Sequence, residues 1–167
     1  MDADKSWVAL LQNRLEAEGY GYRVVNASIS GDTTGGGLRR LPRALEQHDP
    51  DIVVLELGGN DGLRGTPVDI IHRNLAQMIE LAREGGAAVI LAGMQMPPNY
   101  GSAYTEAFAR LYPDLASHFG VGLVGFFLEG VALDPTFMQA DGIHPNEAGQ
   151  PILLQNVWQV LEPKLQS

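Results

Sequence analysis

Short runs of β-branched and aliphatic residues alternate along this chain with longer stretches of helical periodicity, and no other feature constrains the fold as strongly. The runs predict strands at residues 23–26, 51–57, 87–92 and 121–125. Strands that alternate with helices of this length form βαβ units and a parallel sheet. The sequence therefore predicts an α/β protein, with a single domain over residues 1–167 built as a three-layer α/β/α sandwich.

The loops that follow the predicted strands contain most of the Gly, Asn and Asp clusters. In open parallel sheets, ligands bind beyond the carboxyl ends of the strands. We therefore expect functional residues in segments 28–34, 58–64, 94–101 and 134–145. Pro145, which closes the last segment, is expected in the first turn of the C-terminal helix because proline suits that position.

Composition excludes several classes of function. The chain has a net charge of −9, which argues against binding nucleic acid or an anionic membrane surface. It has no cysteine, which excludes disulfides, thiolate metal sites and cysteine nucleophiles. No apolar run is long enough for a transmembrane helix, and the first residues lack the pattern of a signal peptide. We expect no stable membrane insertion and a cytoplasmic location for the chain as written.

Asp141 and His144 form the sharpest chemical signal in the sequence, within Asp141-Gly-Ile-His144. An Asp three residues before a His can accept a hydrogen bond from the imidazole Nδ1–H. That bond fixes the tautomer and leaves Nε2 available as a general base. A plain turn followed by a helix start explains the same residues without chemistry.

Two further loops contain groups that could bind an oxyanion. Asn60 directly follows the clearest buried strand, where its side-chain NH₂ could donate to a developing negative charge. Gly31, in the loop after the first predicted strand, could direct its backbone N–H toward the same point. Turn formation or a phosphate-binding loop would also explain these glycine-rich segments, because such a loop alone is weak evidence.

Three segments together resemble a known family. Asn26-Ala-Ser-Ile-Ser-Gly-Asp-Thr33, Glu56-Leu-Gly-Gly-Asn-Asp-Gly-Leu-Arg64 and Asp141-Gly-Ile-His-Pro-Asn146 are similar to blocks II, III and V of the SGNH (GDSL-like) serine hydrolases. More narrowly, they resemble the thioesterase I, lysophospholipase L1 and arylesterase subgroup. The likeness runs from about Ser6 to the C-terminus, with the blocks in the family's order. It implies a flavodoxin-like sheet with strand order 2-1-3-4-5.

The resemblance also implies roles for the matching residues. Gly31 would donate its backbone N–H, and Asn60 its side-chain amide, to the oxyanion. His144 would act as general base and then general acid, with Asp141 as the carboxylate that orients it. The implied function is a carboxylic ester or thioester hydrolase of the esterase, acyl-CoA thioesterase or lysophospholipase type.

The substrate and location follow from the same resemblance. Asn99 and Tyr100 look like the part of this subgroup that lines the acyl pocket, so a small acyl ester or thioester is the expected partner. No metal and no organic cofactor is implied. Relatives are often periplasmic or secreted.

The family's first block, a strand that ends in Gly-Asp-Ser-Leu and carries the nucleophile, has no counterpart in these 167 residues. We therefore expect four strands, without the family's first strand, in a chain that is N-terminally truncated relative to the family. Removing a serine nucleophile typically lowers turnover about a million-fold, so we expect a crippled hydrolase. An unfilled position in the sheet would favour a homo-oligomer.

Other residues are weaker candidates for chemistry. Ser30 is the nearest substitute for the nucleophile, although the resemblance assigns it to the oxyanion loop. His48, His72 and His118 are expected to be structural, because metal sites need clustered ligands. The alternatives to a hydrolase are a degenerate protein of the same fold that only binds ligand, and a flavodoxin-like module that binds phosphate.

Overall fold

The structure is a computed structural model that describes residues 1–166. It divides into two compact units. Unit 1 combines Met1–Asn26 with the segment from Phe127 to the C-terminus, and unit 2 is Ala27–Phe126.

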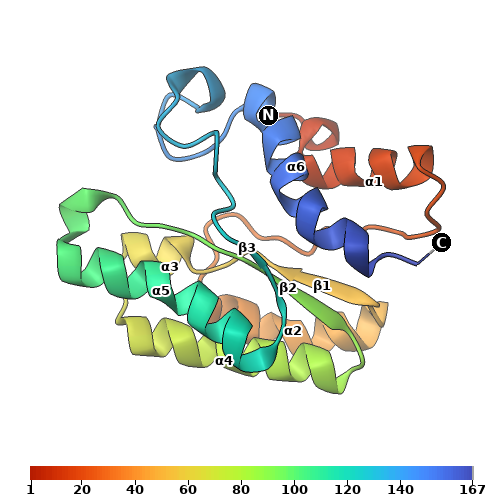
Figure 1. Cartoon of the computed structure of the whole chain (residues 1–167), viewed down its shortest axis with the longest axis horizontal. Helices are drawn as coiled ribbons and strands as arrows, with labels where there is room; N and C mark the ends of the chain where they lie inside the picture. The colour runs from red at the N-terminus through yellow and green to blue at the C-terminus, as the bar shows by residue number, and fades with distance from the viewer. Residues whose placement is uncertain (167) are drawn as a thin grey trace. The chain divides into compact units, whose positions relative to one another are not determined.

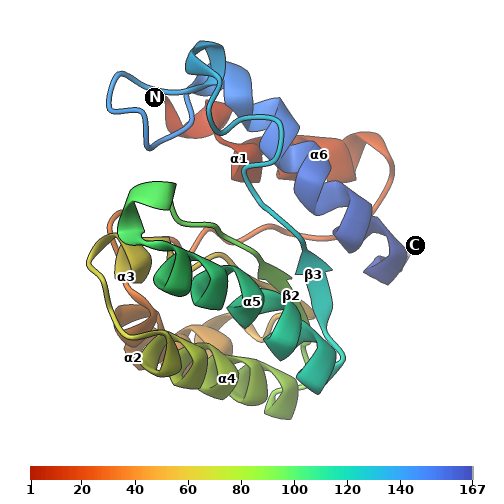
Figure 2. The ribbon, with the colours of Figure 1, turned by 60° about the vertical axis from the view of Figure 1, so that its left-hand side comes forward.

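Unit 2 contains a parallel sheet and its covering helices (Figures 1 and 2). Its elements are α2 (Thr34–His48), β1 (Ile52–Leu55), α3 (Gly59–Leu63), α4 (Val68–Glu84), β2 (Ala88–Ala92), α5 (Ser102–Phe119) and β3 (Gly122–Val124), with a 3-10 turn at Pro98–Tyr100. The strand order is β1-β2-β3, with both pairs parallel. Val53 pairs with Val89, and Leu91 pairs with Leu123.

One face of this sheet carries the core of unit 2. Val53, Leu55, Val89 and Leu91 alternate along their strands and so point to the same side, where they join one apolar cluster with side chains of α2, α4 and α5. Figures 1 and 2 both show these three helices along a single face of the sheet. The apolar side of each of these three helices is therefore buried against the sheet, as the helical periodicity of the sequence predicts.

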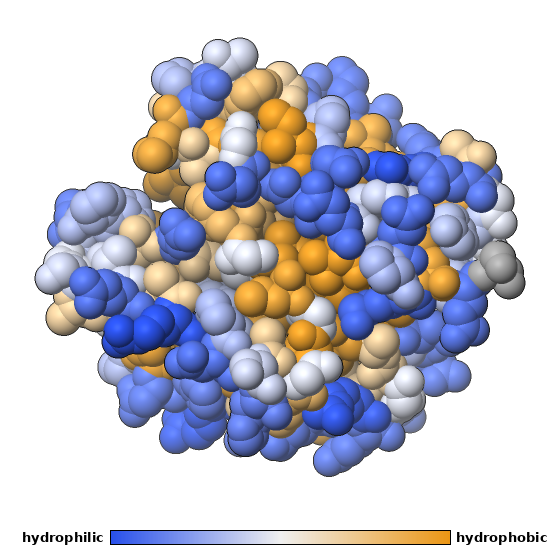
Figure 3. All heavy atoms as spheres, in the orientation of Figure 1, coloured by the Kyte–Doolittle hydropathy of each residue, from blue (hydrophilic) through white to orange (hydrophobic). Residues whose placement is uncertain are grey.

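The surface that α4 and α5 turn away from the core of unit 2 is polar. The region formed by α4 and α5 is mostly hydrophilic in the space-filling view (Figure 3), because the apolar residues of both helices are turned into the cluster. No helix among residues 1–166 is long and apolar enough to cross a membrane.

Unit 1 is built on two packed helices, α1 (Trp7–Ala17) and α6 (Gln150–Leu161). Short 3-10 turns lie at Ala3–Lys5, Pro135–Phe137, Glu147–Gly149 and Glu162–Lys164. Ser6 caps α1 by accepting a hydrogen bond from the Ala9 N–H. The Arg14 guanidinium lies 4.1 Å from the centre of the Trp158 ring, which adds a cation–π contact between the helices.

The predicted strand at Arg23–Asn26 is wrong, and the sheet has three strands among the described residues. The Val24 N–H donates to Gln12 Oε1 at 2.7 Å, and Gln12 Nε2 donates to the Tyr22 carbonyl at 3.2 Å. A side chain of α1 thus takes the place of a neighbouring strand. β-Branched residues favour extended backbone, but a strand also needs a ladder partner, which local sequence does not reveal.

The C-terminal helix begins five residues later than predicted. Pro145 is outside α6, in an isolated antiparallel bridge with Met138. Asn146 then caps the turn that follows, because its Oδ1 accepts from the N–H groups of Ala148 and Gly149. Pro151 occupies the early position in α6 that suits proline.

Candidate active site

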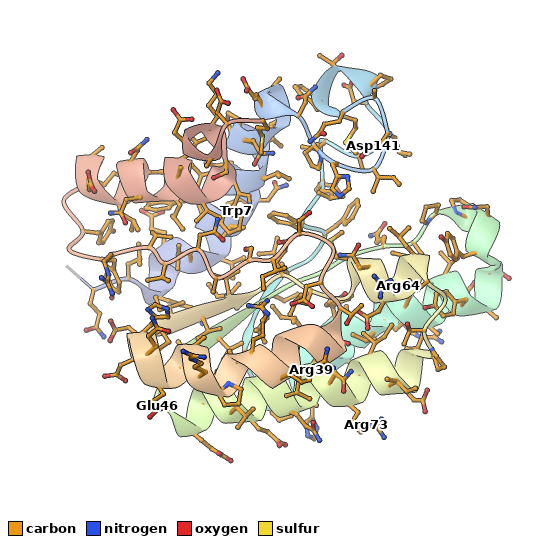
Figure 4. The ribbon with its side chains drawn as sticks, turned by 180° about the vertical axis from the view of Figure 1, so that it is seen from behind. Trp7, Arg39, Glu46, Arg64, Arg73 and Asp141 are labelled. Atoms are coloured by element: carbon orange, nitrogen blue, oxygen red, sulfur yellow. The ribbon has the colours of Figure 1, made fainter. Side chains whose placement is uncertain are left out.

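Asp141 and His144 lie in the loop between β3 and α6, in unit 1, and Asp141 is labelled in Figure 4. Asp141 Oδ2 is 2.6 Å from His144 Nδ1. Asp141 Oδ1 accepts from the backbone N–H groups of Ile143 and His144, at 2.9 and 3.1 Å. The spacing of three residues therefore forms the predicted side-chain pair within a single turn.

The same contacts hold the Asp141 carboxylate in its charged form. The hydrogen bond from His144, followed by the two backbone N–H groups, lowers the pKa of Asp141 from 3.8 to about 2. Both side chains are well exposed, at 61% for His144 and 43% for Asp141. With Nδ1 bound to a carboxylate, Nε2 is the nitrogen available for proton transfer.

Hydrogen bonds within the loop fix its shape. The Gln139 N–H donates to the His144 carbonyl at 2.8 Å, and the Gly142 N–H donates to the Gln139 carbonyl at 2.9 Å. Gly142 has a φ of 68°, a conformation that glycine adopts without steric cost. The Asp-Gly turn is thus the means by which the loop presents the imidazole.

We expect the Asp141 carboxyl to titrate with a midpoint near pH 2, and replacement of His144 by Ala to raise that midpoint toward 3.8. The variant removes the largest cause of the shift and keeps the two backbone donors. Because the folded pKa lies below the ordinary value, the pair is complete above about pH 4 and is lost as pH falls toward 2. NMR of the side-chain carboxyl carbon measures the midpoint.

His118→Ala is the control, since it removes an imidazole that belongs to unit 2. It should leave the Asp141 midpoint where it is. A His144→Ala protein with an unchanged midpoint would refute the hydrogen bond as the cause.

Gly31 and Asn60 both belong to unit 2, and the structure brings their two loops together. Asn60 lies in α3, directly after β1, and its Nδ2 donates to the Asp32 carbonyl at 3.0 Å. Gly31 precedes Asp32 in a turn and has a φ of 76°. An amide NH₂ has two hydrogens, so this bond engages one and leaves the second for another acceptor.

A buried polar cluster reinforces the connection between the same two loops. Asp61 is 3% exposed and accepts from both the N–H and the hydroxyl of Thr34, at 2.8 and 2.7 Å. Asn74 Nδ2 donates to Thr34 Oγ1 at 3.1 Å. Sequence reasoning assigned no role to Asp61 or Thr34. The sequence contains a signal for this pair. Asp61 adjoins Asn60, and Thr34 lies at the start of a helix, so both are expected at the same edge of the sheet.

Tyrosine hydroxyls of α5 and of the 3-10 turn before it anchor the segment that contains Asn60. Tyr100 and Tyr104 donate to the carbonyls of Leu63 and Thr66, at 3.0 and 2.6 Å. Tyr112 donates to the Leu57 carbonyl at 2.9 Å. Burial, followed by the negative charges of Asp61 and Glu56, raises the pKa of Tyr112. The Tyr112 hydroxyl therefore stays a donor at neutral pH.

The remaining predicted residues lie in exposed segments of unit 2. Asn99 is exposed in the 3-10 turn Pro98–Tyr100, beside the half-buried Tyr100. Ser30 is exposed in the turn that precedes α2, whereas the Asp141–His144 pair belongs to unit 1. Among residues 1–166, no group of three or more His, Cys, Asp or Glu side chains could hold a metal ion.

Comparison with solved structures identifies the fold. A crystal structure of TesA matches with a TM-score of 0.95 and 58% identity, over 98% of this chain and 91% of that one. The psychrotrophic esterase EstA from Pseudoalteromonas matches with a TM-score of 0.93 and 36% identity, over 98% of this chain and 90% of that one. The predicted α/β/α class is confirmed, with three strands instead of four.

Proteins of similar sequence are hydrolases as well. The esterase TesA of Pseudomonas aeruginosa is 58% identical over 165 residues, which is 99% of this chain and 82% of the relative. Thioesterase 1/protease 1/lysophospholipase L1 of Escherichia coli is 45% identical over 163 residues, 98% of this chain and 77% of the relative. The model of the GDSL-like lipase/acylhydrolase family matches residues 1–152. The chain therefore belongs to the GDSL-like lipase/acylhydrolase family, the SGNH hydrolases.

Proposed function

We propose that this chain is a hydrolase of acyl esters or thioesters in which His144 transfers protons and Gly31 and Asn60 stabilise the oxyanion. The hydrogen bond of 2.6 Å between Asp141 and His144 carries the proposal. It supplies a base whose tautomer is fixed, which is what acyl transfer to an oxygen nucleophile needs. Membership in a family of lipases and acylhydrolases supports the same reaction class.

In the complete reaction of such an enzyme, His144 Nε2 takes the proton of a serine hydroxyl as the oxygen attacks the acyl carbon. The imidazolium then gives that proton to the leaving alcohol or thiol, and water releases the acyl group by the same route. Asp141 keeps the ring oriented and stabilises its charged form. The family's Gly-Asp-Ser-Leu block, which carries this serine, has no counterpart among these 167 residues.

The oxyanion donors are the backbone N–H of Gly31 and the second Nδ2 hydrogen of Asn60. Donors of this kind act when they are fixed before the charge develops, and losing one typically lowers kcat about 10²- to 10³-fold. The bond from Asn60 to the Asp32 carbonyl supplies that fixation.

We infer that the 167 residues alone hydrolyse esters slowly. His144 would remove a proton from water, the resulting hydroxide would attack the acyl carbon, and the proton would pass to the leaving group. Without a covalent intermediate, a rate on the order of 10³- to 10⁴-fold above water is the expected ceiling. Besides proton transfer by His144, only the oxyanion donors and substrate binding then accelerate the reaction.

Hydrolysis of p-nitrophenyl butyrate by the purified chain tests the proposal. We expect His144→Ala to lower the rate at least about 10-fold, because general base catalysis is typically worth 10²- to 10⁴-fold. His72→Ala is the matched control, since His72 is an exposed imidazole on α4, and its rate should equal that of the wild type.

The same assay separates the competing assignments. Loss of activity in Ser30→Ala, together with acylation of Ser30 seen by mass spectrometry, would make that serine the nucleophile. Equal rates for the wild type and His144→Ala would exclude proton transfer by His144. If neither protein hydrolysed the ester faster than buffer alone, ligand binding would be the remaining proposal for this chain.

A further inference from the structure

The Asp32 side chain is held from two directions in the loop that carries Gly31. Its Oδ2 accepts from Arg40 Nε at 2.9 Å and from Arg40 Nη2 at 2.7 Å, and its Oδ1 accepts from the Thr33 N–H at 2.9 Å. Arg40 Nη1 also donates to the Ala27 carbonyl at 2.9 Å. One guanidinium thus binds both ends of the loop from residue 27 to residue 32.

Gly36 provides the space for this arrangement. A Cβ atom added to Gly36 would overlap Asp32 Oδ1 and come within 2.8 Å of Asp32 Cγ. The carboxylate therefore lies directly against the first turn of α2, where the positive end of the helix dipole favours an anion. Glycine within a helix costs about 1 kcal/mol relative to alanine, and here its missing side chain admits the Asp32 carboxylate.

With its side chain fixed, Asp32 presents its backbone carbonyl to Asn60. That carbonyl accepts from Asn60 Nδ2 at 3.0 Å. The direction of the bond determines which end of the Asn60 amide faces the loop, and so where its second N–H points. Arg40 is 35% exposed and Asp32 is 14% exposed, so water screens this ion pair only in part.

We propose that Arg40, acting through Asp32, is a positioning residue that sets the orientation of the Asn60 amide. The inference rests on the proposed function, in which the second N–H of Asn60 binds the oxyanion. The Arg40 guanidinium donates to the Asp32 carboxylate and to the Ala27 carbonyl, and the bond with Asn60 is made by the Asp32 carbonyl. Its effect on catalysis is therefore exerted through the loop.

NMR of the Asn60 side-chain NH₂, assigned by its disappearance in Asn60→Ala, tests the positioning without requiring activity. In Arg40→Gln we expect both hydrogens to shift toward the values of a solvated amide and to exchange at least about 10-fold faster. Arg40→Lys should restore the signals only in part, because an ammonium cannot form the planar fork of a guanidinium.

Gly36→Ala attacks the same contact from the other side without changing charge. The new methyl group would displace the Asp32 carboxylate, so the Asn60 signals should move as they do in Arg40→Gln. Arg39→Gln is the matched control, because Arg39 is the preceding arginine of α2 and is exposed (Figure 4). It makes the same change of charge and should leave the Asn60 signals unchanged.

Hydrolysis of p-nitrophenyl butyrate supplies the second measurement. If Asn60 binds the oxyanion, Arg40→Gln should lower kcat about 10-fold, a fraction of the loss on removing a whole donor, with KM within about two-fold of the wild type. Asn60 signals that stay in place in a folded Arg40→Gln protein would overturn the positioning role. Displaced signals with an unchanged rate would support the positioning role and refute the oxyanion role of Asn60.

Discussion

Replacing Gly58 with Ala is expected to lower the free energy of unfolding by about 4 kcal/mol, from a strained backbone together with overpacking. Gly58 follows β1 with a φ of 111°, a conformation that residues with a side chain rarely adopt. A Cβ atom there would overlap the Tyr112 hydroxyl and lie 3.3 Å from Tyr112 Cζ. The variant would therefore also displace the bond from Tyr112 to the Leu57 carbonyl.

Thermal or urea unfolding followed by circular dichroism measures this loss, and we expect a fall in Tm of about 10 °C for a chain of this length. Gly65→Ala is the matched control, because Gly65 has a φ of 69° and nothing within 4 Å of an added Cβ. It isolates the backbone strain, which is worth about 1–2 kcal/mol. Equal losses for the two variants would show that contact with Tyr112 contributes nothing.

Replacing Asp61 with Ala is expected to lower the free energy of unfolding by about 3–4 kcal/mol. The variant leaves the N–H and the hydroxyl of Thr34 buried without their acceptor, and each orphaned group costs about 1–3 kcal/mol. Thr34 is fully buried, so water cannot readily replace the carboxylate. Because Asp61 adjoins Asn60, the rate of ester hydrolysis should fall together with stability.

Asp61→Asn is the informative comparison, since its side chain keeps one acceptor oxygen for the Thr34 N–H. We expect it to lose about 1 kcal/mol, the value of a single hydrogen bond. Asp69→Ala removes an exposed carboxylate from the first turn of α4 and should change stability by less than about 1 kcal/mol. Urea denaturation gives all three values, and a loss in Asp61→Ala no larger than in Asp69→Ala would contradict the role of the buried cluster.

The class of fold could be predicted because it depends on periodicity, which is local. The segments 51–57, 87–92 and 121–125 became strands, each one to three residues shorter than the sequence pattern. The segment 23–26 has the same β-branched character, yet the Gln12 side chain bonds the Val24 N–H and the carbonyl of the preceding Tyr22. Pairing is a property of the whole chain, so the propensity of four residues could not decide it.

In the candidate site, too, the local contacts were predictable and the long-range contacts were not. The Asp141–His144 hydrogen bond was predictable because the partners are three positions apart and a single turn suffices to join them. The bonds from Asn60 to Asp32 and from Thr34 to Asp61 join residues 28 and 27 positions apart. Only the parallel sheet brings those loops together. A reader of the sequence can expect polar residues at that edge, but the particular pairs depend on tertiary packing.

The three tyrosine anchors end on main-chain carbonyls, so they require nothing of the side chains at residues 57, 63 and 66. As far as these bonds are concerned, the anchored stretch can change its sequence while its path is preserved. The requirement for a particular side chain falls on the three tyrosines alone. No other residue has the size and shape of tyrosine together with its hydroxyl donor. Side chains between residues 57 and 66 can therefore diversify over evolutionary time while the three tyrosines keep the backbone of that segment in place.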